Sequence, residues 1–128
     1  MASLLSKKFE RQDVQFELSQ KNFKGNMYAI AFDLDTNILQ DTYAGSSWNN
    51  AYMEIRKILA LHGFEWQQGS VYFGNRTVDA VTCFLAIQDL TRKLHWFAAS
   101  VQDIRMLRIE EMNDLRPVID STINQGKA

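Results

Sequence analysis

Residues 27–34 read MYAIAFDL, in which large apolar side chains alternate with small or acidic ones. Side chains at every second position of a strand share one face, so this period predicts a β-strand. The large face consists of Tyr28, Ile30, Phe32 and Leu34, and the small face consists of Ala29, Ala31 and Asp33. We therefore predict that the first strand of the fold ends beside an acidic side chain.

A helix is predicted downstream, after a polar loop that follows the strand. Apolar residues at helical spacing run over 51–62, and Gly63 ends the run. Ser46 or Ser47 precedes this stretch and is a favourable N-cap residue, because a serine hydroxyl accepts a hydrogen bond from the first free amides of a helix. This segment is the first predicted helix.

The rest of the chain predicts two strands, a second helix and a fourth strand. The segment 64–74, FEWQQGSVYFG, is typical of a hairpin with its turn at Gln68-Gly69. Thr77 is the expected cap of the second helix, whose inner stripe runs from position 80 to 94. The segment 104–109 predicts the fourth strand, and Pro117 favours the start of a final helix or edge segment.

The order strand, helix, strand, strand, helix, strand predicts an α+β, ferredoxin-like βαββαβ fold. In this arrangement a four-stranded antiparallel sheet carries two helices on one face. The other face then needs a partner, and the small side chains of Ala29 and Ala31 would let a second sheet approach closely. We therefore predict a sheet-to-sheet homodimer in which two copies of Asp33 lie near the twofold axis.

Length and composition fit one soluble domain. The 128 residues carry a net charge of -1, one cysteine and no apolar run of the roughly 20 residues that span a bilayer. We predict an N-terminal arm or extension over 1–26, the ferredoxin-like domain over 27–120 and a C-terminal tail over 121–128. The absence of a signal-peptide pattern and of any possible internal disulfide favours a cytoplasmic protein without membrane contact. The near-neutral charge argues against strong nonspecific binding to nucleic acid.

Two carboxylates stand in FDLDTNIL, residues 32–39, and resemble the nucleophile motif of the haloacid dehalogenase-like phosphatases. In those enzymes a strand ends in D-x-D, the first Asp attacks phosphate and the second handles the proton of the leaving group. Their fold is a doubly wound parallel sheet, in which each strand and crossover takes roughly 30 residues. Too little chain follows Leu34 to build it. The phosphatase is therefore the less favoured alternative.

Three segments together resemble the virulence-associated protein D family over residues 27–120: MYAIAFDL at 27–34, NNAYMEIRKILALHGFEWQQGSVYF at 49–73 and SVQDIRMLRIEEMNDL at 100–115. Members are small ferredoxin-like proteins, similar to the nuclease-fold protein of CRISPR spacer acquisition, and are described as endoribonucleases. The resemblance implies cleavage of RNA phosphodiester bonds, as the toxin of a toxin–antitoxin pair with an antitoxin as protein partner. The basic residue usual in the third segment is Gln102 here.

The resemblance singles out Asp33 as the catalytic acid. One carboxylate per chain is few for a metal site, but a dimer brings two, and Mg²⁺ commonly uses one or two carboxylates together with water and substrate phosphates. Asp33 is therefore also the predicted ligand of Mg²⁺ or Mn²⁺. The alternative role for Asp33 is to cap the turn DLDTN, because aspartate is favoured in turns.

Ser70, Tyr72, Arg105 and Asn50 are the predicted substrate contacts. The hydroxyls of Ser70 and Tyr72 suit a phosphate, and the Tyr72 ring suits stacking on a base. Arg105 suits a phosphate as well, although an ion pair with Asp103 or Glu110 is the favoured interpretation. Asn50 opens the first helix, where free amides suit an anion.

We interpret Trp66 and Trp96 as core or interface residues, which is the commoner role of tryptophan. A noncatalytic ferredoxin-like dimer that binds RNA or an antitoxin is the alternative function. The near-neutral charge and Gln102 favour this alternative, whereas Asp33 at a strand end favours the enzyme.

Overall fold

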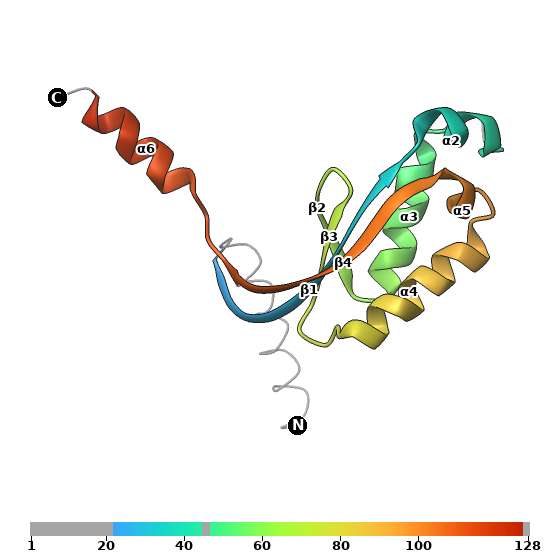
Figure 1. Ribbon diagram of the computed structural model, residues 1–128, viewed down its shortest axis with the longest axis horizontal. Helices are drawn as coiled ribbons and strands as arrows, with labels where there is room; N and C mark the ends of the chain where they lie inside the picture. The colour runs from blue at the N-terminus through green and yellow to red at the C-terminus, as the bar shows by residue number, and fades with distance from the viewer. Residues whose placement is uncertain (1–21, 45–46, 127–128) are drawn as a thin grey trace, which may run out of the picture. The chain divides into compact units, whose positions relative to one another are not determined.

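The computed structural model describes residues 22–44 and 47–126, and Figure 1 shows a β-sheet with helices beside it. The sheet has the order β2-β3-β1-β4. Its strands are β1 (Phe23–Leu34), β2 (Phe64–Gln68), β3 (Val71–Gly74) and β4 (Val101–Met112). The helices are α2 (Thr36–Thr42), α3 (Asn50–Leu61), α4 (Ala80–Lys93), α5 (Phe97–Ser100) and α6 (Arg116–Gln125).

The chain divides into two compact units. One unit is Met27–Ile109 and contains all of the residues described as buried, and the described part of the other is 22–26 and 110–126. The predicted boundaries at residues 26 and 120 stay a prediction. Within the described residues, no helix combines the length and the apolar character needed to cross a bilayer.

All neighbouring strands run antiparallel. Ile30 of β1 lies opposite Tyr72 of β3, and Trp66 of β2 lies opposite the same Tyr72. The end of β1 meets the start of β4, where the Asp35 amide donates to the Ser100 carbonyl oxygen at 2.7 Å. This sheet confirms the α+β, antiparallel prediction. It also excludes the doubly wound parallel sheet of the haloacid dehalogenase-like phosphatases, so that alternative is wrong.

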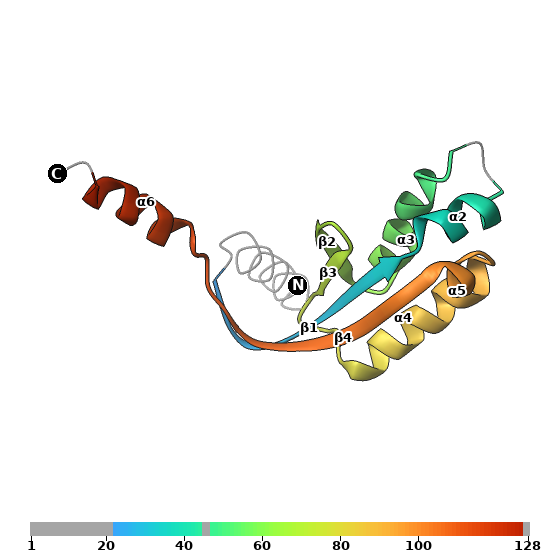
Figure 2. The same ribbon diagram turned by 45° about the horizontal axis from the view of Figure 1, so that its top comes forward.

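The core packs the large face of β1 against α3 and α4. Ile30, Phe32 and Leu34 belong to a single buried cluster with apolar residues of both helices. Side chains on the opposite face of β1 must therefore point away from these helices. Figures 1 and 2 show α2 and α5 side by side at the end of β1, so this end of the sheet is framed by short helices.

Several local predictions differ from the structure. The segment predicted as a polar loop after β1 contains α2, of which only Leu39 is buried. The cap of α3 is Asn49, which makes no side-chain capping bond, and not Ser47; the alternative, Ser46, lies outside the described residues. The cap of α4 is Asp79 rather than Thr77, because the Asp79 carboxylate accepts from the Thr82 amide at 2.9 Å.

The strands and the last helix also differ in extent. The first strand begins at Phe23, four residues before its predicted start, and the fourth spans 101–112 rather than 104–109. The helix α5 was not predicted. The final helix begins at Arg116 with Pro117 in its first turn, as the proline indicated.

Two glycines are required by their surroundings. Gly69 has a φ of +50° in the turn between β2 and β3, a backbone conformation that side chains disfavour. At Gly74, an added Cβ would lie 2.7 Å from the Cβ of Val78, closer than two carbons can approach without movement. The hairpin and its connection to α4 therefore depend on these residues.

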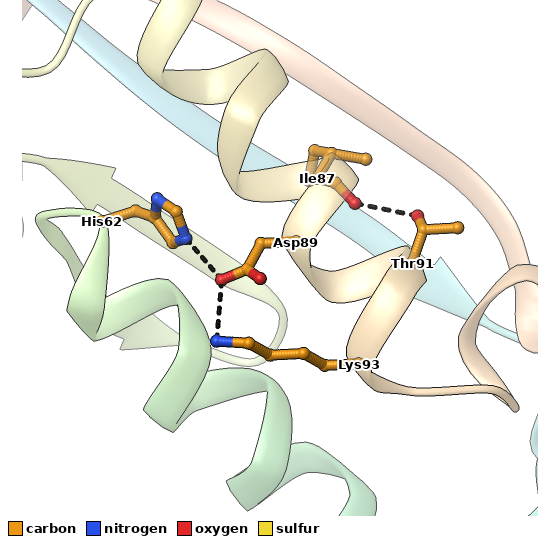
Figure 3. A network of polar contacts seen from close by, with 5 residues as sticks. All are labelled: His62, Ile87, Asp89, Thr91 and Lys93. Carbon is orange, nitrogen blue, oxygen red and sulfur yellow. Dashed lines mark hydrogen bonds and ion pairs between the residues drawn. The ribbon is translucent and has the colours of Figure 1, made fainter.

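A polar network joins α3 to α4 (Figure 3). The His62 ring, just after α3, lies with its Nε2 2.8 Å from the Asp89 carboxylate of α4, and Lys93 lies 3.1 Å from the same oxygen. The hydrogen bonds from His62 and Lys93 lower the pKa of Asp89. The network therefore fixes the two core helices relative to each other on the solvent side.

Candidate active site at the end of the first strand

Asp33 is exposed at the end of β1, between Phe32 and Leu34, whose side chains are buried in the core. By alternation, its carboxylate faces away from the core. Among the described residues it makes no side-chain hydrogen bond. Its charge reaches α3, because the pKa of Tyr52 is raised first by burial and then by the negative charge of Asp33. The Asp33 carboxylate is therefore available for another partner.

Asp35 has a structural role. Its carboxylate oxygen accepts hydrogen bonds from the amides of Asn37 at 2.9 Å and Ile38 at 3.0 Å, which makes Asp35 the N-cap of α2. Such caps satisfy amides that a helix leaves without partners. The capping role that was the alternative for Asp33 thus belongs to its neighbour Asp35.

The turn between β2 and β3 lies beside the end of β1. The Phe32 amide donates to the Ser70 carbonyl oxygen at 3.1 Å, and Ser70 is half-buried. The structure therefore brings Ser70 to the same end of the sheet as Asp33. Asn50 is exposed as the first residue of α3, directly before the buried Ala51.

Tyr72 is not accessible to a base. It is 2% exposed and its ring stacks on Phe32, with 5.9 Å between the ring centroids. The reason is the register, which places Tyr72 opposite Ile30 on the face covered by the helices. Burial raises the pKa of Tyr72. The prediction that the Tyr72 ring stacks on a nucleobase is therefore wrong, and Ser70 and Tyr72 do not form one contact surface.

Arg105 forms the ion pair that was the favoured interpretation. Its Nε lies 3.0 Å from the Asp103 carboxylate, and both side chains are exposed. Ile104, between them, packs against the core, so Asp103 and Arg105 face away from the core as Asp33 does. Asp103 is thus a second carboxylate on this face, on the strand next to β1. The sequence analysis considered it only as a partner for Arg105, although the alternation with Ile104 indicates its face.

Gln102 contacts the cap of α2. Its side-chain amide lies 3.4 Å from the second carboxylate oxygen of Asp35. Gln102 is therefore part of the support for the N-terminal end of α2.

A preformed metal centre is not present in the described part of the chain. There, no three His, Cys, Asp or Glu side chains gather into a group that would hold an ion. Of the carboxylates of Asp33 and Asp103, that of Asp103 is engaged with Arg105, whereas that of Asp33 has no partner among the described residues. Because Mg²⁺ often keeps several waters and binds through one or two carboxylates and substrate phosphates, Asp33 fits an ion that arrives with the substrate.

The two tryptophans that were interpreted together differ in their surroundings. Trp96 is 3% exposed and packs edge-on against Tyr43, which confirms its place in the core. Trp66 is 40% exposed on the edge strand β2. The interpretation of Trp66 as a packing residue therefore accounts for only part of its surface.

Comparison with known proteins identifies the fold class first. A sequence model of the family described as CRISPR associated protein Cas2 matches residues 26–116, which contain the whole sheet from Met27 onward and the site at the end of β1.

Individual proteins are also similar to this chain in sequence. Endoribonuclease VapD 2 of Riemerella anatipestifer is 54% identical over 93 residues, covering 73% of this chain and 99% of the relative. Endoribonuclease VapD homolog of Helicobacter pylori is 53% identical over 93 residues, covering 73% and 96%. Endoribonuclease VapD of Dichelobacter nodosus is 45% identical over 93 residues, covering 73% and 97%. The chain belongs to the VapD family and has a Cas2-like fold.

Proposed function

We propose that this protein is an endoribonuclease of the VapD type that cleaves RNA phosphodiester bonds, with Asp33 at its catalytic centre. The class of enzyme is supported by relatives that carry this name and align over nearly their full length. The observation that carries the role of Asp33 is its exposed carboxylate without a hydrogen-bond partner among the described residues, two positions from a carboxylate that is fully engaged in a cap.

Cleavage of an RNA phosphodiester needs an activated nucleophile, either water or the neighbouring 2′-hydroxyl, and stabilisation of charge on the phosphate. The Asp33 carboxylate is suited to accept the proton of that nucleophile. A Mg²⁺ or Mn²⁺ ion held by Asp33 would supply positive charge to the nonbridging oxygens. The Ser70 hydroxyl and the Asn50 side chain are proposed contacts to the RNA backbone.

Arg105 is a further proposed phosphate contact. Its ion pair with Asp103 is exposed on both sides, and exposed pairs contribute little to stability, about 0–1 kcal/mol. A phosphate group can therefore replace Asp103 as the partner of the guanidinium at small cost. The exchange would also release the Asp103 carboxylate next to the bound RNA.

We further propose that the functional unit is a sheet-to-sheet homodimer. On the face away from the helices, the register places Ala31 opposite Val71, both of which are partly exposed, and Ala29, which is already fully buried within the chain, opposite Phe73. Leu107 of β4 adds a side chain that is 42% exposed. This mixture of small and apolar residues supports close approach of a second copy, which would bring two Asp33 carboxylates into one site.

The proposed cellular role is that of a cytoplasmic toxin restrained by an antitoxin protein, and it rests on the family. Induced synthesis of the wild-type chain should then arrest growth of the host, whereas the Asp33→Ala chain, made to the same level, should not. Equal arrest by both chains would contradict a role that depends on RNA cleavage.

The direct test of the enzyme uses purified protein and a labelled RNA. Wild type and Asp33→Ala are compared with Mg²⁺ and with a chelator, and Asp35→Ser serves as the matched carboxylate control. We expect cleavage by wild type and by Asp35→Ser, and none by Asp33→Ala, with all three folded. Loss of RNA cleavage in the presence of the chelator would show that the reaction requires a divalent metal ion. Equal cleavage by wild type and Asp33→Ala would remove Asp33 from the mechanism.

A noncatalytic dimer that binds RNA or an antitoxin is the second candidate. The observation in its favour is Gln102, which stands where the family usually has a basic residue and contacts the Asp35 carboxylate. In the same assay, this candidate predicts no cleavage by any variant and retention of RNA or antitoxin by Asp33→Ala.

A further inference from the structure

The exposed Trp66 ring is held in a fixed orientation by two interactions. Its indole N–H donates to the Gly69 carbonyl oxygen at 2.8 Å, which ties the ring to the turn between β2 and β3. The guanidinium carbon of Arg56, from α3, lies 4.7 Å from the centroid of the ring. The indole nevertheless remains 40% exposed, so part of a preorganised aromatic surface faces solvent.

This surface belongs to the same end of the sheet as Asp33. The turn that accepts the indole hydrogen bond continues into Ser70, whose carbonyl oxygen accepts from the Phe32 amide next to Asp33. On the helix side, Arg56 follows Tyr52 by one turn of α3, and the Tyr52 hydroxyl senses the charge of Asp33. Trp66 pairs with Tyr72 on the face that the helices cover, whereas Asp33 faces away from it, so the aromatic surface and the candidate catalytic carboxylate share one end of the sheet but lie on opposite faces.

The charge of Arg56 is not neutralised by a neighbour. Arg56 is exposed and forms no ion pair with any described residue, while its positive charge acts to lower the pKa of the nearby Tyr72 against the larger effect of burial. A guanidinium stacked on a ring keeps its in-plane N–H groups free to donate. If Trp66 and Arg56 served only to pack β2 against α3, neither the free N–H donors of Arg56 nor the exposed part of the indole would be required.

We propose that Trp66 and Arg56 form a nucleotide-binding subsite for single-stranded RNA, in which a base stacks on the exposed part of the indole and Arg56 donates to the adjoining phosphate. Unpaired bases expose the faces that such stacking requires, and stacking on a tryptophan tolerates any base. The proposal rests on the proposed function for its substrate class, RNA, but not on the role of Asp33 in the chemistry.

The test measures binding separately from cleavage. All variants carry Asp33→Ala and are studied with a chelator, so that a short fluorescent single-stranded RNA stays intact, and Kd is measured by fluorescence anisotropy. Trp66→Leu keeps apolar bulk and removes the planar ring, whereas Trp66→Phe keeps a ring and removes the indole hydrogen bond. Arg56→Lys keeps the charge and loses the planar stack. Lys57→Ala, one position along α3, controls for loss of any exposed cation.

We expect Trp66→Leu to raise Kd about tenfold, since stacking of one base on an aromatic side chain is commonly worth that much. Trp66→Phe should retain most of the affinity, Arg56→Lys should bind more weakly than wild type, and Lys57→Ala should change Kd little. Thermal melting of each variant checks the fold.

Three results would overturn the subsite: unchanged binding by Trp66→Leu, equal losses in Trp66→Leu and Trp66→Phe, or a loss in Lys57→Ala as large as that in Arg56→Lys. Cleavage by the chain with Asp33 intact is scored independently. If that chain cuts RNA but Trp66→Leu binds normally, the nuclease stands and the subsite falls. If Trp66→Leu loses binding but no chain cuts RNA, the subsite stands and the nuclease falls.

Discussion

Asp33 and Asp35 lie two residues apart, but only the Asp35 carboxylate accepts hydrogen bonds from nearby backbone amides, those of Asn37 and Ile38. The pair that looks like a catalytic motif in the sequence therefore divides into a free carboxylate and a helix cap. The two residues should respond differently to substitution, and this difference can be measured.

Replacing Asp35 by Ala should lower the free energy of unfolding by about 1 kcal/mol, the usual cost of losing an N-cap. For a domain of this size, the loss corresponds to a melting temperature lower by roughly 4–8 °C. Asp35→Ser, which can still cap α2, should recover most of the stability. RNA cleavage per folded molecule should be unchanged in both. Loss of RNA cleavage in a folded Asp35→Ser chain would show that Asp35 takes part in catalysis.

The sheet-to-sheet dimer predicts a specific effect of charge on the face away from the helices. Ala31→Glu should convert the dimer to a monomer, because its added carboxylate would be buried without a partner where the two sheets meet. Light scattering at micromolar concentration measures the mass. Ala60→Glu, on the exposed side of α3, is the matched control and should remain a dimer. A monomeric wild type would remove the proposal of paired Asp33 residues.

The His62–Asp89–Lys93 network predicts a pH dependence of stability. The pKa of Asp89 is lowered by the hydrogen bonds from His62 and Lys93, so the ionised form favours the folded state. This contribution is present above about pH 4, the unfolded pKa of aspartate, and is lost as the pH falls through the lowered folded value. Asp89→Asn should therefore melt below wild type at pH 7, and the gap should narrow as the pH falls below the ordinary pKa of aspartate. A gap that is constant with pH would contradict this account.

Gly74→Ala should destabilise the protein by about 1–3 kcal/mol, the usual range for overpacking, because the new Cβ would lie 2.7 Å from that of Val78. Gly69→Ala is the comparison: no atom lies within 4 Å of its added Cβ, and only the backbone at φ +50° opposes the change. Urea unfolding of both variants measures the difference. Gly74→Ala with the stability of wild type would show that the segment before α4 moves freely.

Alternation of side chains was sufficient to predict β1 and the face of Asp33, because a strand with one buried side must keep a period of two. The same reasoning could not predict the burial of Tyr72. That burial depends on pairing with Ile30, a contact between segments distant in the sequence. Which face of β3 the helices would cover was therefore not contained in the local pattern.

The helix α2 was missed for a different reason. It is short, it buries only Leu39, and its strongest signal is the cap residue Asp35, which had been assigned to a possible catalytic pair. The exposure of Trp66 could not be predicted from the local sequence either, because the guanidinium of Arg56 from α3, rather than an apolar side chain, lies over its ring. Local signals thus predicted the four strands and the core helices α3 and α4, and pairing between elements determined the candidate site.

The single cysteine has a practical consequence. Cys83 is 1% exposed, and burial raises the pKa of its thiol, so it should be inert to maleimide reagents while the protein is folded. A second cysteine introduced at an exposed position away from the proposed interface, such as Ala60, would then be the only thiol to react. Spin labels attached there would report the distance between two copies in solution without prior removal of the native cysteine.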